Sequence, residues 1–297
     1  MSTNLRFKLD EEQKNIPLAR YTSLRVGGPA ERFFIPSSVD HLVAYLQQLP
    51  QGTPITVLGL GSNVLVPDTG IAGAVVLLHK GLNTLTQIAP DRLQVFAGVP
   101  CPKVAKYSVN QGLTGGEFLC GIPGTMGGAL RMNAGCYGGQ TWDLVQRVQV
   151  WDATLGLQVL TPEAFEVAYR SVGGCAGKIF IAAELKFTPG QSTPGIAELL
   201  TKRAASQPLG TWNCGSVFKN PEGKFAAQLI EAAGLKGRQV GGAVVSMKHA
   251  NFIINTGKAT ATDILTLIAE VQATVFSYTG VKLELELCVL GGDHHGA

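Results

Sequence analysis

The chain contains 297 residues, of which 45% are hydrophobic and 15% are charged, and its formal net charge is +3 at pH 7. This composition can bury a sizeable core, which excludes a disordered chain, and the length suggests two or more modules. The charge is mild and no run of Lys and Arg forms the basic stripe expected of a nucleic-acid binder, so we expect no nucleic acid, and an anionic small ligand fits this charge equally well.

No segment has the pattern of a membrane anchor or a secretory signal. The apolar runs are far shorter than the roughly 20 residues that span a bilayer. Residues 1–14 mix acidic and basic side chains without an apolar core. We therefore expect a cytoplasmic protein, and no obligate protein partner is evident.

Cysteine and histidine spacing argues against a metal centre. The six cysteines form no CxxC pair and have no histidine-flanked spacing, which predicts reduced thiols. Among the histidines, His294 and His295 lie in a polar tail, and His249 alone occurs in a polar and aromatic cluster. The cysteines are Cys101, Cys120, Cys136, Cys175, Cys214 and Cys288.

After an N-terminal segment, residues 1–20, the first predicted strand covers residues 55–58 and leads into a turn with the sequence VLGLGSNV, residues 57–64. This turn fails the dinucleotide fingerprint GxGxxG, because Val64 occupies the third glycine position and no acidic residue follows about 20 positions later. Its backbone N–H groups and the Ser62 hydroxyl can still donate hydrogen bonds to a phosphate. An ordinary turn fits this segment equally well.

Strands are predicted next at residues 74–78 and 93–97, and a longer glycine-rich stretch follows at residues 115–138. Glycine lets the main chain approach a flat ring or a pyrophosphate, Pro123 stiffens the turn, and Thr125 and Asn133 offer side-chain hydrogen bonds. Two such loops favour a long cofactor with phosphates in its middle, FAD more than a mononucleotide. Composition by itself does not name the cofactor.

Three more strands, at residues 145–151, 156–160 and 179–187, indicate an α+β first half that is rich in strands. Pro and Gly at residues 189–195 then interrupt every periodic pattern, which predicts a linker. A second module is expected to begin near Ile196.

The second module is predicted to contain helices at residues 196–206, 224–233 and 260–278. Gly234 follows the second helix as a C-terminal cap, and Gly280 can end the third. Thr260 and Asp263 form a weak capping box at the start of the third helix. Residues 281–289 then alternate strictly between apolar and polar, which predicts a half-buried strand with Glu284 and Glu286 on one face.

Several motifs in this order resemble the UDP-N-acetylenolpyruvoylglucosamine reductase family, and the resemblance extends from about residue 21 to residue 291. Besides the loop at residues 59–66, the motifs are TSLRVGGPAER (22–32), GIPGTMGGA (121–129), NAGCYG (133–138), YR (169–170), GSVFKNP (215–221), AAGLKG (232–237), SMKHANFIIN (246–255) and LELELCVLG (283–291). The resemblance implies a vanillyl-alcohol-oxidase-type FAD-binding domain at residues 21–188, with two α+β subdomains that divide near residues 80–90. A C-terminal α+β substrate-binding domain at residues 196–297 would follow the linker.

The same resemblance implies a reaction in two stages. NADPH would reduce bound FAD and leave, and the enolpyruvyl ether of UDP-N-acetylglucosamine would then be reduced to UDP-N-acetylmuramate, a step of peptidoglycan synthesis. Hydride from the flavin would add to the terminal alkene carbon and drive charge onto the substrate carboxylate as an enolate. A proton delivered to the neighbouring carbon would complete the reaction.

Three residues carry catalytic roles by this resemblance. Arg170 would hold the carboxylate and the developing enolate charge with its planar fork of donors. Ser216 would give the proton to the enolate carbon. Glu286 would lie beside the carboxylate and be at least partly protonated, because like charges that are crowded together in a dry site raise a pKa. Without the motifs, each would be an ordinary surface or turn residue, and Glu284 would fit the strand pattern as well as Glu286.

The remaining site predictions concern the cofactor and the substrate. Tyr169, Asn220, Lys248 and His249 are candidate substrate contacts, although a lone histidine such as His249 is more often structural. The candidate cofactor-binding residues are Arg25, Gly59, Gly61, Ser62, Asn63, Gly121, Ile122, Pro123, Gly124, Thr125, Gly127, Gly128, Ala129, Asn133 and Gly135.

The chain departs from the family pattern at two points. Val172 occupies the position, two residues after Arg170, where the family commonly has Ser, and the interval from Arg170 to Ser216 matches the shorter form of the family, without the loop that carries a substrate-side tyrosine. Two alternatives remain: another FAD oxidoreductase of the same fold, or a non-catalytic flavin or UDP-sugar binding protein. A nicotinamide-binding Rossmann enzyme is disfavoured by Val64.

Overall fold

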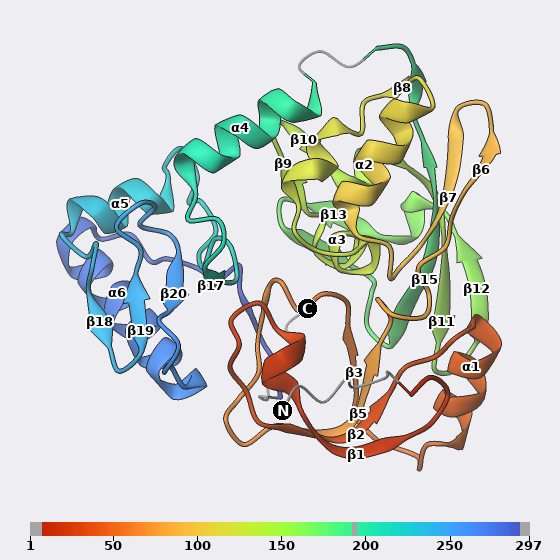
Figure 1. Cartoon of the computed structure of the whole chain (residues 1–297), viewed down its shortest axis with the longest axis horizontal. Helices are drawn as coiled ribbons and strands as arrows, with labels where there is room; N and C mark the ends of the chain where they lie inside the picture. The colour runs from red at the N-terminus through yellow and green to blue at the C-terminus, as the bar shows by residue number, and fades with distance from the viewer. Residues whose placement is uncertain (1–7, 192–194, 292–297) are drawn as a thin grey trace, which may run out of the picture.

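The computed structural model describes residues 8–191 and 195–291, and the chain forms two lobes connected by helix α4 (Ile196–Ser206) (Figure 1). Both lobes combine helices with strands, which confirms the predicted α+β class. Within the described ranges, no helix is both long and apolar enough to cross a membrane.

The first lobe begins with a four-stranded sheet in the order β1-β2-β5-β3. Its strands are β1 (Gln13–Pro17), β2 (Pro29–Phe34), β3 (Ile55–Leu58) and β5 (Ile71–Leu77), with helix α1 (Val39–Gln48) between β2 and β3. Strand β1 pairs antiparallel with β2, whereas β2 and β3 both run parallel to β5. Residues 13–17, assigned by the sequence to an N-terminal segment, are thus part of this sheet.

A second, five-stranded antiparallel sheet completes the first lobe, in the order β12-β11-β15-β7-β6. Its strands are β6 (Leu85–Ala89), β7 (Arg92–Phe96), β11 (Val145–Asp152), β12 (Gly156–Leu160) and β15 (Lys178–Lys186). One face packs against α2 (Cys101–Asn110) and α3 (Met126–Met132) in a buried cluster. On the other face, Ile181 joins α1 and the first sheet in a second cluster, so α1 lies between the two sheets.

The loops at the edge of this lobe contain short strands and 3-10 helices. They are η1 (Leu18–Tyr21), β4 (Val64–Leu65), β8 (Leu113–Thr114), η2 (Glu117–Gly121), β9 (Gly135–Cys136), β10 (Gly139–Gln140), η3 (Thr141–Leu144), η4 (Pro162–Ala164), β13 (Glu166–Ala168), β14 (Ser171–Gly173) and β16 (Thr188–Pro189). The pairs β9–β10 and β13–β14 are tight hairpins.

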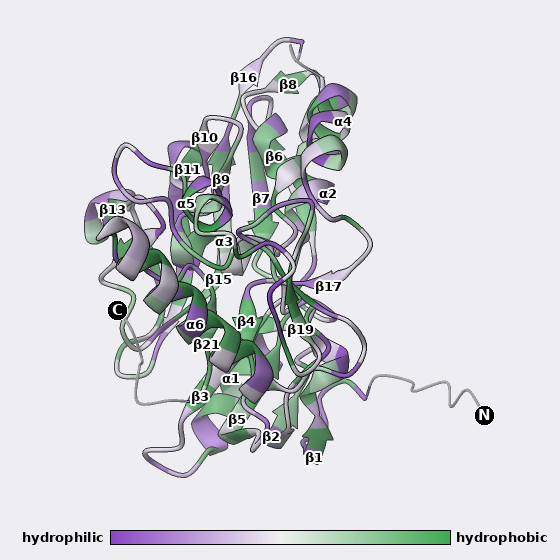
Figure 2. Ribbon diagram, turned by 90° about the vertical axis from the view of Figure 1, so that its left-hand side faces the viewer, coloured by the Kyte–Doolittle hydropathy of each residue, from purple (hydrophilic) through white to green (hydrophobic). Residues whose placement is uncertain are grey.

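The C-terminal lobe packs two helices on a small antiparallel sheet in the order β17-β20-β19-β18. Its elements are β17 (Trp212–Asn213), α5 (Ala226–Ala232), β18 (Gln239–Val240), β19 (Ala243–Val245), β20 (Ile253–Asn255), α6 (Ala261–Thr279) and β21 (Cys288–Val289). The hydrophobic colouring of β5 and β19 in Figure 2 marks strands that contribute to the two cores. Each fully buried aliphatic side chain contributes roughly 1.5–3 kcal/mol.

The helix predictions for this lobe are confirmed in their main features. Helix α6 has Thr260 as its N-cap, with both hydrogen bonds of the capping box to Asp263 present. It ends at Gly280, whose φ of 71° is a left-handed conformation that glycine adopts at low cost. Gly234 likewise follows α5 with a φ of 73°.

The regular strand predicted at residues 281–289 is wrong. This segment is extended, but its strand pairing is limited to a single bridge between Leu285 and Phe218 and the two residues of β21. The N–H groups of Glu286 and Leu287 both donate to the carbonyl of Val217, at 2.9 and 3.2 Å, which breaks the regular alternation of ladder bonds. Glu284 therefore remains solvent-exposed, whereas Glu286 is largely buried.

The region predicted as a linker is only partly irregular. Pro189 belongs to β16, and residues 192–194 lie outside the described residues. Although the sequence assigns residues 196–206 to the second module, Leu199 of α4 is buried in the core of the first lobe. The Tyr137 hydroxyl also donates to the Leu199 carbonyl at 2.8 Å. Helix α4 is therefore packed on the first lobe and carries the chain toward the second.

The two lobes share a core and several hydrogen bonds. Leu24, Val26 and Leu65 from the first lobe belong to the buried cluster of the C-terminal lobe. The Asp68 carboxylate accepts hydrogen bonds from the Ala261 and Thr262 N–H groups, at 2.8 and 2.9 Å, so a residue of the first lobe caps α6. Strand β21 pairs in parallel with β4. These contacts fix the C-terminal lobe against the loop that follows β3.

Candidate active site

Arg170 occupies the turn of the β13–β14 hairpin and contacts groups from two other segments. Its Nε donates to Glu286 Oε1 at 2.9 Å, and its Nη2 donates to the carbonyl of Gly135 at 2.8 Å. The side chains of Arg170 and Glu286 are 18% and 14% exposed, so this ion pair lies largely away from solvent. The arrangement joins a hairpin of the first lobe to the last segment of the C-terminal lobe.

The backbone at Arg170 is strained. Its φ is 54°, a left-handed value that is uncommon for a residue with a side chain. Such a conformation persists where surrounding contacts hold it, and it occurs often at functional sites. The Tyr169 ring lies beside the guanidinium, with its centroid 5.3 Å from Cζ, within the range of a cation–π contact.

Burial raises the pKa of Glu286, although Arg170 acts in the opposite direction. Removal of the carboxyl group from solvent is the cause in the structure, in the absence of a substrate carboxylate. A carboxyl group in this position can take up a proton more readily than an exposed one. It can then donate a hydrogen bond to an anion.

Ser216 is followed by Val217, whose main chain is hydrogen-bonded to Glu286. The carbonyl of Val217 accepts the Glu286 N–H at 2.9 Å, and the Val217 N–H donates to the carbonyl of Asn251 at 2.9 Å. The Asn251 side chain also accepts from the Phe218 N–H at 2.9 Å and donates to the Phe218 carbonyl at 2.8 Å. Because Asn251 is 3% exposed, these bonds hold the Ser216 segment from inside the lobe.

The structure brings the two glycine-rich loops together. A side chain at Gly59 would collide with the Thr125 hydroxyl, and a Cβ at Gly124 would lie 3.2 Å from Ser62 Oγ. Gly61 has a φ of 61° and abuts the carbonyl of Tyr21, so no other residue fits there without a shift. At Gly128 a Cβ would meet nothing within 4 Å. The two loops therefore lie against each other, with Gly128 facing open space, and the Met126 and Gly127 N–H groups at the start of α3 already donate to the Val99 and Ala97 carbonyls, at 2.9 and 2.8 Å. The Ser62 hydroxyl, at the junction of the two loops, is a donor that fits a phosphate-bearing cofactor.

Other glycines in these loops serve packing within the protein. A side chain at Gly121 would meet Cys136 Sγ at 2.6 Å, and one at Gly127 would meet Ala97 at 2.9 Å. Ile122 and Ala129 are buried in the core beneath, whereas Pro123 is exposed. Their part in the site is to shape the loop at residues 121–129.

Three candidate cofactor residues direct hydrogen bonds to the protein itself. Asn133 is buried, and its amide bonds to Gln140, the Ala168 carbonyl and the Trp142 N–H, which supports the Arg170 hairpin. Asn63 Nδ2 donates to the carbonyl of Glu286 at 2.9 Å. Arg25 is exposed and donates to the carbonyl of Arg20 at 2.6 Å.

The candidate substrate residues of the C-terminal lobe also have protein partners. Asn220 accepts from the Ala226 N–H at 3.1 Å, and Lys248 Nζ donates to the Ala204 carbonyl at 2.6 Å. His249 Nδ1 accepts from the Asn251 N–H at 3.3 Å, and burial lowers its pKa. His249 thus supports the segment around Asn251.

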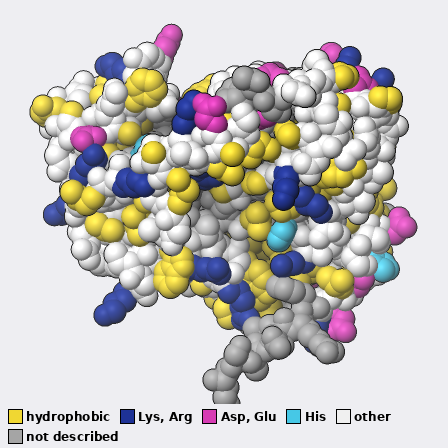
Figure 3. All heavy atoms as spheres, turned by 45° about the horizontal axis from the view of Figure 1, so that its top comes forward, with side chains coloured by type: hydrophobic (Ala, Val, Ile, Leu, Met, Phe, Trp, Pro, Cys, Tyr) yellow, Lys and Arg dark blue, Asp and Glu magenta, His cyan; other side chains and the backbone are white. Residues whose placement is uncertain are grey.

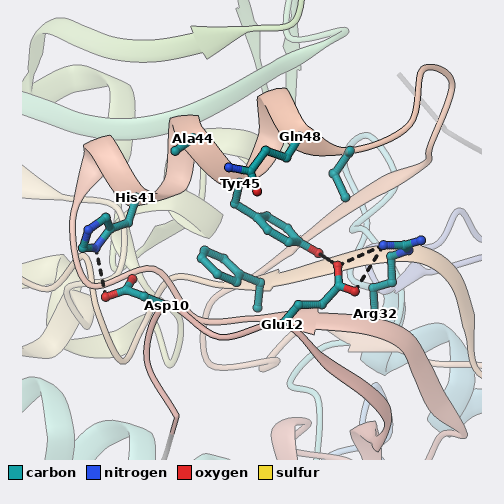
Figure 4. Close-up of a pocket in the computed structure, with 9 residues that line it drawn as sticks. Asp10, Glu12, Arg32, His41, Ala44, Tyr45 and Gln48 are labelled. Carbon is teal, nitrogen blue, oxygen red and sulfur yellow. Dashed lines mark hydrogen bonds and ion pairs between the residues drawn. The ribbon is translucent and has the colours of Figure 1, made fainter.

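Lys and Arg side chains gather at the rims of a hollow between the two lobes (Figure 3). A different hollow of about 510 Å³ lies beneath α1, where the charged groups pair with one another (Figure 4). There Arg32 and Tyr45 both bond to Glu12, and His41 lies 2.9 Å from Asp10. None of the candidate catalytic residues lines that second hollow.

The described part of the chain holds no group of three or more His, Cys, Asp and Glu side chains arranged for a metal ion. All six cysteines are free thiols. Burial raises the pKa of Cys214 to about 12, so this thiol beside the site stays protonated.

Sequence reasoning missed Asn251 and assigned Gly135 a different role. Asn251 belongs to the motif SMKHANFIIN, but the sequence does not show which segment its amide holds. An asparagine inside an apolar run was the available signal, since buried polar groups need partners. Gly135, predicted to bind cofactor, provides the carbonyl that accepts from Arg170.

Comparisons with known proteins show the family to which the chain is similar. A family model described as UDP-N-acetylenolpyruvoylglucosamine reductase, C-terminal domain, matches residues 207–290, and one described as FAD binding domain matches residues 30–159. UDP-N-acetylenolpyruvoylglucosamine reductase from Legionella pneumophila (strain Corby) is 50% identical over 281 residues, covering 93% of this chain and 91% of that protein. The enzyme of the same name from Methylococcus capsulatus is 52% identical over 278 residues, with the same coverage. The crystal structure of UDP-N-acetylenolpyruvylglucosamine reductase from Thermus caldophilus superposes with a TM-score of 0.80 at 35% identity, covering 94% of this chain and 98% of the other.

Proposed function

Because the chain belongs to the UDP-N-acetylenolpyruvoylglucosamine reductase family, we propose that it uses NADPH and FAD to reduce UDP-N-acetylglucosamine enolpyruvate to UDP-N-acetylmuramate. The observation that carries this proposal is the contact between Arg170 and Glu286. It joins the first lobe, whose residues 30–159 match an FAD binding domain, to the end of the region that matches the family's C-terminal domain. A site at this junction can receive both a cofactor and a substrate.

Arg170 binds the carboxylate of the enolpyruvyl group in this proposal. A guanidinium has five N–H donors, and the contacts with Glu286 and Gly135 use two of them. The others are available to a carboxylate and to the negative charge that develops on it as hydride arrives. Holding that charge lowers the barrier to hydride addition.

Glu286 acts beside the substrate carboxylate in its protonated form. Burial raises the pKa of Glu286 against the opposing effect of Arg170, which favours this form, and a neutral carboxyl avoids repulsion between two carboxylates. Ser216 then gives its proton to the enolate carbon. Its hydroxyl needs an exact position for this step, because a weak acid transfers a proton well only over a short, aligned path.

FAD, when bound, would take hydride from NADPH and pass it to the substrate. Gly59, Gly61, Ser62 and the loop at residues 121–129 would hold it, because the close packing of the two glycine-rich loops brings the Ser62 hydroxyl beside Gly124. We place the FAD-binding domain at residues 21–188 with a division near residues 80–90. The substrate-binding domain follows α4, and we expect the enzyme to work in the cytoplasm, where nucleotide-sugar precursors are made.

A spectroscopic experiment tests the proposal. The protein is reconstituted with FAD and reduced with NADPH under anaerobic conditions, and UDP-N-acetylglucosamine enolpyruvate is then added. Bleaching of the flavin band by NADPH and its return with the substrate are expected. A flavin that bleaches but does not return with this substrate would indicate another oxidoreductase of the same fold, and failure to bind FAD would refute the proposal altogether.

A further inference from the structure

Asn63 lies in the first glycine loop, but its side chain is directed to the C-terminal segment. Its Nδ2 donates to the main-chain carbonyl of Glu286 at 2.9 Å and lies 3.4 Å from Met132 Sδ. Both N–H groups of this amide are thus engaged within the protein, the second in a weaker contact. Met132 belongs to α3, the helix that follows the second glycine loop.

The main chain around Asn63 repeats this connection. The Asn63 carbonyl accepts the N–H of Cys288 at 3.1 Å, and the Leu65 carbonyl accepts the N–H of Leu290 at 2.9 Å. The loop and the C-terminal segment therefore lie side by side from residue 63 to residue 65. The amide bond from Asn63 extends the pairing to Glu286.

Glu286 is held on both sides of its Cα by different parts of the molecule. Its N–H donates to the Val217 carbonyl in the Ser216 segment, and its carbonyl accepts from Asn63 in the glycine loop. Since the neighbouring Leu287 N–H also uses Val217, regular strand pairing does not fix the backbone at this point. The Asn63 bond supplies a constraint that a continuous sheet would otherwise provide.

We propose that Asn63 is a positioning residue for Glu286: it sets the backbone of the carboxylate residue from the glycine loop, so that the same loop shapes the cofactor site and the substrate site. This inference rests on the proposed function, because it takes Glu286 to act on the substrate. It assigns Asn63 to the stage in which substrate is reduced rather than to the stage in which NADPH reduces the flavin.

Two variants separate the amide bond from the rest of the loop. Asn63→Ala removes the side chain, and Asn63→Asp keeps its size but replaces the donor with an acceptor that repels the Glu286 carbonyl. Asn83→Ala is the matched control, because Asn83 also donates from Nδ2 to a main-chain carbonyl, that of His79, at 3.3 Å. Amide hydrogen exchange in the peptide covering residues 285–290, measured without cofactor, is expected to accelerate in both Asn63 variants and to stay unchanged in the control.

Kinetics of the two stages then show how this change acts. With FAD at saturation, Asn63→Ala is expected to slow flavin reoxidation by the enolpyruvyl substrate about tenfold, near the upper end for one neutral hydrogen bond. Flavin reduction by NADPH should stay within about twofold. In a Glu286→Ala background the Asn63→Ala change should have almost no further effect, because the main-chain carbonyl at residue 286 remains but the carboxylate that Asn63 would position is absent.

The outcomes distinguish the two levels of the proposal. If Glu286→Ala leaves reoxidation unchanged, the role assigned to Glu286 fails, and the proposed mechanism fails with it. If Glu286→Ala slows reoxidation but the double variant is slowed by the product of the Asn63→Ala and Glu286→Ala factors, Asn63 does not act through Glu286 and the inference is overturned. Equal slowing of both stages, or unchanged exchange in residues 285–290, would overturn it as well.

Discussion

Replacing Arg170 with Lys tests whether the fork of the guanidinium matters beyond its charge. Arg170 reaches Glu286 with Nε and the Gly135 carbonyl with Nη2. A lysine retains the positive charge, but its single ammonium group cannot take the place of two separated nitrogens in a plane. We expect Arg170→Lys to keep one of these contacts and lose the other, together with part of the grip on the substrate carboxylate.

The size of the rate decrease follows from the loss of one hydrogen bond in Arg170→Lys. A hydrogen bond that involves a charged group contributes about 1.5–3 kcal/mol. Because about 1.4 kcal/mol corresponds to a factor of ten in rate, substrate-driven reoxidation of the flavin should slow roughly 10- to 160-fold. Reduction of the flavin by NADPH should change less than about twofold, since Arg170 has no role in that stage. Anaerobic stopped-flow absorbance at the flavin band measures both stages.

Arg147→Lys provides the control for this experiment. Arg147 also forms an ion pair with a glutamate, Glu184, at 3.1 Å, but its side chain is 55% exposed. Exposed ion pairs contribute little, so both stages should proceed at the unaltered rate. If Arg170→Lys slowed the two stages equally, or left reoxidation at the wild-type rate, the role assigned to the Arg170 fork would be refuted.

Three further changes have defined outcomes. Ser216→Ala should slow reoxidation of the flavin by the substrate at least about 100-fold, which is the lower end for general acid catalysis, and it should leave reduction of the flavin by NADPH unchanged. A comparable loss of rate in both stages would contradict the proton-donor role. Asp68→Ala should lower stability by roughly 1–2 kcal/mol at neutral pH through loss of the α6 cap, about 2–8 °C in Tm. Burial opposes ionisation of Asp68, but hydrogen bonds from Ala261 and Thr262 lower its pKa below the usual value for an aspartate. The stabilisation by Asp68 should therefore be complete at a pH above the usual aspartate pKa, and it should disappear as the pH falls through the lowered pKa. A pH-independent difference in Tm would argue against this explanation. Asn251→Ala leaves the buried N–H and carbonyl of Phe218 without this partner and should lower the free energy of unfolding in denaturant by about 1–3 kcal/mol. Unchanged stability would show that the two hydrogen bonds between Asn251 and Phe218 are dispensable.

Local sequence signals predicted those elements whose ends are marked within the segment itself. Helix α6 was located correctly because Thr260, Asp263 and Gly280 lie at its two ends. The segment at residues 281–289 had an equally clear alternation, and that pattern correctly placed Leu283 and Leu287 in the core. Alternation does not specify a hydrogen-bonding partner, however, and the double use of the Val217 carbonyl depends on tertiary packing.

The candidate site was predicted mainly by the order of motifs, and its internal contacts were not. Arg170 and Glu286 are separated by 116 positions, and no periodic pattern relates them. Glycine-rich composition indicated a loop that approaches a ligand, but it did not show that Asn63 and Asn133 direct their amides into the protein. Those bonds depend on which segments meet in three dimensions. Arg170 could be selected from sequence, whereas the strain at its φ of 54° became evident only in the folded chain.

The pairing of the first glycine loop with the C-terminal segment has a consequence for how the protein is made. Asn63 and Glu286 are 223 positions apart, so at 5–20 residues per second the ribosome needs about 10–45 s to supply the partner after the loop has been synthesised. During that interval Leu24, Val26 and Leu65, which belong to the core of the second lobe, have no partners from that lobe to cover them. The nascent first lobe therefore exposes apolar surface, and chaperone capture during translation should act on this region until residues 281–291 emerge.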